Sequence, residues 1–200
     1  MISHEIIQLQ MDKILEWKSS GITSTYTDLP GLIEQNHSFN YQLWHAEDRA
    51  RRDDMGFEYV YHAKREIDHC NQQRNNRMEA IDQALWEKLK PSTDSKCPVH
   101  SETPGMMIDR LSILALKSFH MQIQTTRTDV DNTHRQTCQH KLDVIIAQQN
   151  QLAICYDELI NSINNGSRTF RVYHQFKMYN DPNLNPELYQ SNKSAQIEKV

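Results

Sequence analysis

The sequence predicts an all-α protein, an antiparallel bundle of four or five long helices joined by short connections. Only 5 glycines and 6 prolines occur among the 200 residues, and the prolines leave long spans uninterrupted. Within these spans apolar residues recur every three or four positions, which is the period of an amphipathic helix. The length suits one domain, expected as a helical bundle over residues 1–166 followed by an arm over residues 167–200.

The first half of the chain contains three predicted helices. The first covers residues 2–17, and Ser19-Ser20-Gly21 ends it. The second is expected over residues 36–54, with Pro30 in a preceding turn or at a first helical position. The third spans residues 57–89 and ends at Lys90-Pro91. Its apolar stripe is interrupted at residues 68–77, where Cys70 is the single apolar side chain.

The second half contains two predicted helices and an arm. The segment from Thr103 to Met121 is apolar on nearly every side, so it is expected to be buried all round and to continue to about residue 130. From residue 132 to 165 apolar spacings of four and three form a heptad seam, which predicts packing within the bundle, with a homodimer as the alternative. The arm after Gly166 is aromatic and basic, and its last ten residues are expected to be disordered.

Composition excludes several classes of partner. A net charge of -4 and a pI near 6.2 give no overall attraction to nucleic acid or to an acidic membrane. The longest apolar stretch, residues 106–116, is too short and too charged to cross a bilayer, and the N-terminus lacks the pattern of a signal peptide. The four cysteines have no paired spacing and are expected to be reduced, so a cytoplasmic location is predicted. No zinc-site spacing, glycine-rich phosphate loop or dinucleotide-binding motif occurs.

The most informative feature is charge within the apolar helix. Asp109, Arg110 and Lys117 lie where an unpaired charge costs several kcal/mol, so they are expected to have partners or a ligand. Two other helices offer polar groups that could meet them. The second carries Trp44, His45, Asp48 and Arg52 on adjoining faces, and the third carries Asp68, Asn71, Arg74 and Asn75 within its interrupted stripe.

Two interpretations of these groups remain open. In the first they form a structural network, with Asp109 paired to Arg74 and Lys117 paired to Asp48 or Asp68. In the second they enclose a polar chamber that binds phosphate or carboxylate through its cations. The ligand-binding candidates are Trp44, His45, Asp48, Arg52, Asp68, Asn71, Arg74, Asn75, Asp109, Arg110 and Lys117. A weaker alternative is Mg²⁺ held by Asp48, Asp68, Glu79 and Asp109, as in helical metal-dependent phosphohydrolases.

Four segments of the chain resemble an uncharacterised bacterial all-helical family known as a domain of unknown function. They are NYQLWHAEDRARRDD, AKREIDHCNQQRNNRMEAID, ETPGMMIDRLSILALKSFHM and FRVYHQFKMYND, and the resemblance covers roughly residues 38–180. Members of that family often occur near genes for glycosyl transfer and cell-envelope polysaccharide, so the resemblance implies a role in that metabolism. It brings no catalytic residues, and therefore no mechanism.

The sequence thus predicts a helical bundle whose central charged site binds a phosphorylated or sugar-nucleotide-like ligand. It does not distinguish an enzyme from a binding protein. The alternative function is a non-catalytic accessory protein that binds a partner enzyme or dimerises, and the third is the metal-dependent phosphohydrolase.

Overall fold

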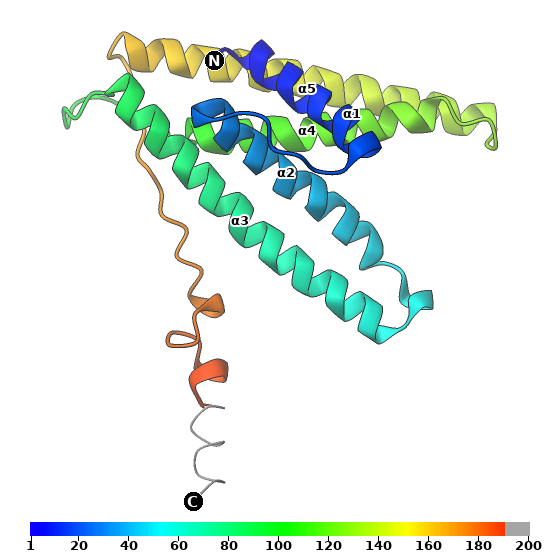
Figure 1. The fold of residues 1–200 in the computed structure, drawn as a ribbon. Helices are drawn as coiled ribbons and strands as arrows, with labels where there is room; N and C mark the ends of the chain where they lie inside the picture. Colours follow the sequence, from blue (N-terminus) through cyan, green and yellow to red (C-terminus); the bar gives the residue numbers. More distant parts are fainter. Residues whose placement is uncertain (191–200) are drawn as a thin grey trace, which may run out of the picture.

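The computed structural model describes residues 1–190 and confirms the all-α bundle (Figure 1). Its helices are α1 (Ser3–Ser20), α2 (Asp28–Arg49), η1 (Asp53–Met55), α3 (Phe57–Leu89), α4 (Pro104–Thr125), α5 (Asn132–Asn164) and η2 (Met178–Asn180), where η marks a single 3₁₀ turn. The expected disorder of the last ten residues falls outside the described part. Among the helices of residues 1–190, none has the length and apolarity that a bilayer crossing requires.

The predicted bounds hold for α1, α3 and α5 and are wrong for α2 and α4. The second helix begins at Asp28 rather than 36, so of the turn or helical start expected around Pro30, the structure has the helical start. It ends at Arg49 rather than 54, where a turn follows and Gly56 takes a φ of 87° that reverses the chain into α3. Helix α4 ends at Thr125, short of the expected residue 130.

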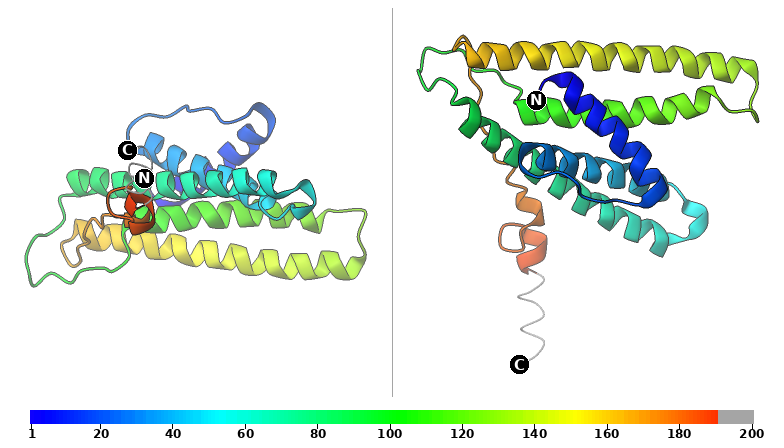
Figure 2. Two further views of the ribbon diagram at one scale, coloured as in Figure 1. Left: turned by 90° about the horizontal axis from the view of Figure 1, so that it is seen from below. Right: turned by 45° about the horizontal axis from the view of Figure 1, so that its top comes forward.

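The bundle consists of two antiparallel hairpins, α2–α3 and α4–α5, crossed by α1 (Figures 1 and 2). The axes of the two hairpins diverge, so α4 packs against α2 and α3 on one flank and against α5 on another. The main core lies where the elements cross. Its fully buried members include Ile6, Ile33, Ile81, Ile108, Leu111, Tyr156 and Phe170.

A buried ion pair attaches α1 to α2. Lys13 Nζ lies 2.8 Å from the carboxylate of Glu34, and both side chains are almost completely buried. The same carboxylate accepts hydrogen bonds from the backbone N–H groups of Thr25 and Tyr26. A buried charge pair is tolerated when its remaining lone pairs are satisfied in this way. The pair therefore holds the connection between the two helices as well as the helices themselves.

Helices α3 and α4 are in close backbone contact at Gly105. Its N–H donates a 2.7 Å hydrogen bond to Oδ1 of the buried Asp82, and a Cβ at this position would lie 2.5 Å from the carbonyl oxygen of Met78. Only glycine fits such a contact. Burial raises the pKa of Asp82 to about 6, although hydrogen bonds from Thr103 and Gly105 oppose this rise.

The arm after α5 passes beside α3 and then extends away from the helices (Figures 1 and 2). An isolated parallel bridge joins Thr169 to Val99 in the α3–α4 connection. Phe170 is fully buried and packs edge-on against Trp86. Further along, His174 hydrogen-bonds to Glu79, and Asn180 donates to Gln72 at 3.1 Å. The arm thus follows α3 from near its end to its middle, and side-chain contacts hold it there.

We expect Asp82→Asn to change how stability depends on pH. The folded pKa lies above the unfolded value near 3.8, so the stabilising contribution is complete below pH 4 and is lost as pH rises through 6. The amide oxygen still accepts the Gly105 hydrogen bond but carries no charge. The free energy of unfolding of D82N should therefore rise relative to wild type by up to about 3 kcal/mol between pH 4 and 7. Urea denaturation at both pH values measures this, and a constant difference would contradict the assignment.

Candidate functional site

Of the three charges in α4, the structure buries only Asp109. Its exposure is 2%, whereas Arg110 and Lys117 are exposed. The prediction of a helix buried all round is therefore wrong. The reason is that α4 has one flank on the α2–α3 hairpin and another on α5, and a strip between these contacts remains open to solvent. Arg110 and Lys117 lie on that strip.

The Asp109 carboxylate is the hub of a buried polar network. Arg74 of α3 binds it in bidentate fashion, with Nε 2.8 Å from Oδ1 and Nη2 2.7 Å from Oδ2. From α2, the side-chain amides of Asn36 and Asn40 donate to Oδ1 at 3.0 and 2.9 Å. Such charge-assisted bonds compensate for the burial of the carboxylate. The structural network expected from the sequence is thus present in its Asp109–Arg74 pair.

The network continues through uncharged groups that sequence reasoning missed. Asn40 also donates to the Ser112 hydroxyl at 3.0 Å, and His37 Nδ1 lies 2.7 Å from the same oxygen. The His37 ring is fully buried and stacks on Trp17 with centroids 5.3 Å apart. Burial lowers the pKa of His37 to about 3, so the ring is neutral at physiological pH. The available signal was the spacing of four that places Asn36 and Asn40 on the helix face of Trp44.

Arg74 reaches from this network into a cavity of about 370 Å³, which we call the Arg74 pocket. Its lining is Asn40, Leu43, Trp44, Glu47, Asp48, Arg51, Arg74, Ile113 and Leu116. The Arg74 side chain is 23% exposed. Its Nε and Nη2 atoms bind Asp109, while Nη1 makes no hydrogen bond within residues 1–190. The pocket therefore contains a guanidinium that is held rigidly and still has donors to offer.

The walls of the Arg74 pocket combine an aromatic ring with charges of both signs. Trp44 stacks on His120 at 4.4 Å with the rings 7° from parallel, and His45 lies edge-on to His120. Burial, with a smaller contribution from His45, lowers the pKa of His120. Arg51 forms a 2.7 Å ion pair with Glu47 at the rim. The pocket can thus offer stacking, hydrogen-bond donors and acceptors together.

The arm brings a further cation near Arg74. Burial and then the positive charge of Arg74 lower the pKa of Lys177, while Asp68 opposes the shift. Lys177 is half-buried, and it lies between the arm contacts at His174 and Asn180. Lys177 of the arm therefore contributes to the electrostatic potential around the Arg74 guanidinium.

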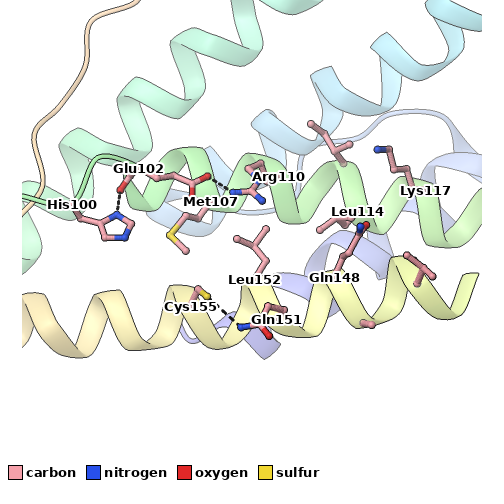
Figure 3. A pocket seen from close by; sticks show the side chains of 13 residues that line it. His100, Glu102, Met107, Arg110, Leu114, Lys117, Gln148, Gln151, Leu152 and Cys155 are labelled. Carbon is pink, nitrogen blue, oxygen red and sulfur yellow. Dashed lines mark hydrogen bonds and ion pairs between the residues drawn. The ribbon is translucent and has the colours of Figure 1, made fainter. Parts of the chain in front are cut away.

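The other predicted residues lie elsewhere. Arg52 is exposed beyond the end of α2 and pairs with Asp54 at 2.7 Å, and Arg51 occupies the pocket instead. Asp68 pairs with Lys64 and Arg65 along α3, while Asn71 and Asn75 are half-buried outside the pocket. Arg110 pairs with Glu102 at 2.6 Å and, with Lys117, lines a groove between α4 and α5 (Figure 3). The expected pairing of Lys117 with Asp48 or Asp68 is absent from the described chain.

The four carboxylates proposed for Mg²⁺ do not converge. Asp109 binds Arg74, Asp68 binds lysine and arginine on its own helix, and Glu79 binds His174 of the arm. Asp48 lines the Arg74 pocket without the other three. Among residues 1–190 no three histidine, cysteine, aspartate or glutamate side chains are grouped as a metal site requires. The described residues thus offer no donor set for the metal-dependent hydrolase expected as a third function.

We expect Asp109→Ala to destabilise the fold strongly. Removing the carboxylate leaves the Arg74 guanidinium without its anionic partner and takes one acceptor from each of the amides of Asn36 and Asn40, which costs about 3–5 kcal/mol. Arg110→Ala is the matched control on the next residue, because its exposed ion pair with Glu102 is worth at most about 1 kcal/mol. Chemical denaturation compares the two. Equal losses would show that the buried network is not what holds these helices together.

His37→Gln should alter pH dependence in the opposite sense from Asp82→Asn. Because the folded pKa of His37 is about 3 and the unfolded value is 6.5, its stabilising contribution is present above pH 6.5 and lost as pH falls. Between pH 7 and 4.5 the wild type should lose up to about 2.7 kcal/mol relative to H37Q. Denaturation curves at both pH values measure the difference. A parallel decline of both proteins would mean that His37 is protonated in the fold.

Comparison with known proteins identifies the family. The family profile described as "Protein of unknown function (DUF4254)" matches residues 31–172, which include α2 from Gly31 onward, all of α3, α4 and α5, and every residue of the Arg74 pocket. Neither a curated protein nor a solved structure matches the chain. Since the match extends over well more than half of the sequence, this chain belongs to the DUF4254 family of proteins of unknown function.

Proposed function

We propose that this protein binds a small sugar phosphate in the Arg74 pocket. The observation that carries the proposal is the Arg74 guanidinium, which two hydrogen bonds to buried Asp109 hold in place while it lines a solvent-accessible cavity. A planar guanidinium fixed in this way is suited to phosphate oxygens, because little side-chain entropy is lost when they bind. Arg51 at the rim supplies a second guanidinium.

The remaining groups of the pocket favour a sugar over inorganic phosphate. Besides the two arginines, the lining contains the carboxylates of Glu47 and Asp48 and the amide of Asn40. Carboxylates repel free phosphate but accept hydrogen bonds from hydroxyl groups. Trp44 provides an apolar surface beside them. A ligand with a phosphate at one end can bind the arginines, and hydroxyl groups at its other end can bind the carboxylates and the amide.

The size of the cavity favours a monosaccharide phosphate over a sugar nucleotide. Its volume of about 370 Å³ lies near the lower limit of roughly 300–1,000 Å³ for ligand pockets. Sugar phosphates are also precursors of polysaccharides, the setting that the family resemblance implies. Two further hypotheses extend this proposal: the pocket binds a larger sugar nucleotide, or the protein converts the bound ligand enzymatically.

Thermal-shift measurements with glucose 1-phosphate test the proposal. At one hundred times its dissociation constant a ligand of the folded state stabilises by about 2.7 kcal/mol, which raises the melting temperature by several degrees. Glucose and inorganic phosphate, each lacking half of the ligand, should give smaller shifts. UDP-glucose distinguishes the sugar-nucleotide alternative. If none of the four compounds raises the melting temperature, the proposal is wrong.

Two surface variants connect the shift to this pocket. Arg51→Gln removes an exposed guanidinium and should weaken binding of glucose 1-phosphate about tenfold, as expected for one charge-assisted contact. Asp48→Asn removes an exposed carboxylate that would accept a hydroxyl group. Arg65→Gln on α3 lies outside the pocket and serves as the control. Equal affinity in wild type, R51Q and D48N would place the ligand elsewhere.

A further inference from the structure

The α4–α5 hairpin leaves one of its faces uncovered. A groove of about 860 Å³ runs between the two helices (Figure 3). Met107 and Leu152 form its buried base, and Leu114 and Val144 lie further along it. Helix α1 packs on a different side of the hairpin, where Ser3 binds Asp157 of α5. Within residues 1–190 nothing fills this groove, although its base is apolar.

The outer face of α5 carries apolar side chains beside the groove. Val144 is 44% exposed and Ile154 is 54% exposed, with Ala147 between them. Val144, Gln151 and Glu158 are seven residues apart, so they lie in one row along the helix. The row is separate from the buried heptad seam of Leu142, Gln149, Leu152, Tyr156 and Leu159, which packs inside the bundle. Helix α5 therefore has a second face suited to helix packing.

Two charges at opposite ends of this face lack partners within the described chain. Lys117 of α4 and Val144 of α5 both line the groove, and Glu158 lies two heptads beyond Val144 along α5. Both residues are exposed, and neither takes part in an ion pair within residues 1–190. A second molecule with a carboxylate opposite Lys117 and a cation opposite Glu158 would complement both charges.

We propose that a second copy of this chain docks on the groove, with the two α5 helices antiparallel about a twofold axis at Gln151. In that register position 144 of one copy faces position 158 of the other, because both are seven residues from the axis. Glu158 of the second copy then lies beside Lys117, and the symmetry creates the pair twice. Ala147, four residues from the axis, lies within one residue of the level of Ile154 of the second copy, which is three residues from the axis. A twofold contact must be self-complementary, and this face meets that requirement because it carries both Lys117 and Glu158.

An open groove also favours a helix over a small apolar ligand. Because the groove is open along its length, an aliphatic chain lying in it would keep one side in water. A docked helix covers the apolar base, presents its own polar side outward and satisfies its backbone hydrogen bonds internally. The second copy supplies such a helix. This inference is independent of the sugar phosphate proposed for the Arg74 pocket.

Sedimentation equilibrium of charge-reversal variants tests the dimer. Lys117→Glu and Glu158→Lys should each weaken association of the full-length protein about tenfold or more, because each places like charges opposite one another. The double variant K117E/E158K restores opposite charges and should recover association. Lys88→Glu, an exposed lysine of α3 away from the groove, is the matched control and should leave association unchanged. A monomeric wild type, or a double variant no better than the single ones, would overturn the proposal.

Disulfide cross-linking tests the register independently of the charges. In a Cys155→Ser background, Gln151→Cys places two thiols at the twofold axis and should give a covalent dimer on oxidation. Asn150→Cys is equally exposed but is turned about 100° around the helix, so it should cross-link much less. Equal cross-linking of the two variants, or none by Q151C, would rule out this arrangement.

Discussion

The fold depends on the need to satisfy one buried carboxylate. Asp109 lies in the middle of the most apolar helix, and its oxygen atoms accept four hydrogen bonds. No single helix can supply these donors. Two amides come from α2 and a guanidinium comes from α3, so the positions of three helices along their axes are fixed together. The interrupted apolar stripe of α3 follows from the same requirement, because Arg74 must point inward. The Arg74 pocket then forms where this arginine reaches the edge of the packed core.

Part of this arrangement could be predicted from the sequence because it depends on local pattern. The bounds of α1, α3 and α5 follow from apolar spacing and from Gly or Pro at their ends, and both properties act within a few residues. The Asp109–Arg74 pair was one of two interpretations, since a charge in an apolar run and an arginine in an interrupted stripe each need a partner. The early start of α2 was missed because Pro30-Gly31 is also typical of a turn, although Leu29, Leu32 and Ile33 keep helical spacing.

The other parts of the candidate site depend on tertiary packing, which the local sequence pattern does not indicate. Whether Arg110 and Lys117 are buried is decided by how far α5 covers α4, and this depends on how the two helices pack after the short connection over residues 126–131. Asn36, His37 and Asn40 are uncharged, and on a helix such residues look the same whether exposed or buried. As a result the structure divides the predicted chamber into two cavities on different flanks of α4. Only Ile113 lines both of them.

The contact between Ser3 and Asp157 has a consequence for the order in which the protein folds during synthesis. The first helix leaves the ribosome long before its binding surface on α5 exists, since the two residues are 154 positions apart. At roughly 5–20 residues per second, that delay amounts to about 8–30 s. The α2–α3 hairpin can form meanwhile from local contacts, but the apolar side of α1, with Ile6 and Leu9, must wait for later segments to cover it fully. Newly made chains therefore expose part of this helix to chaperones until α5 has been synthesised.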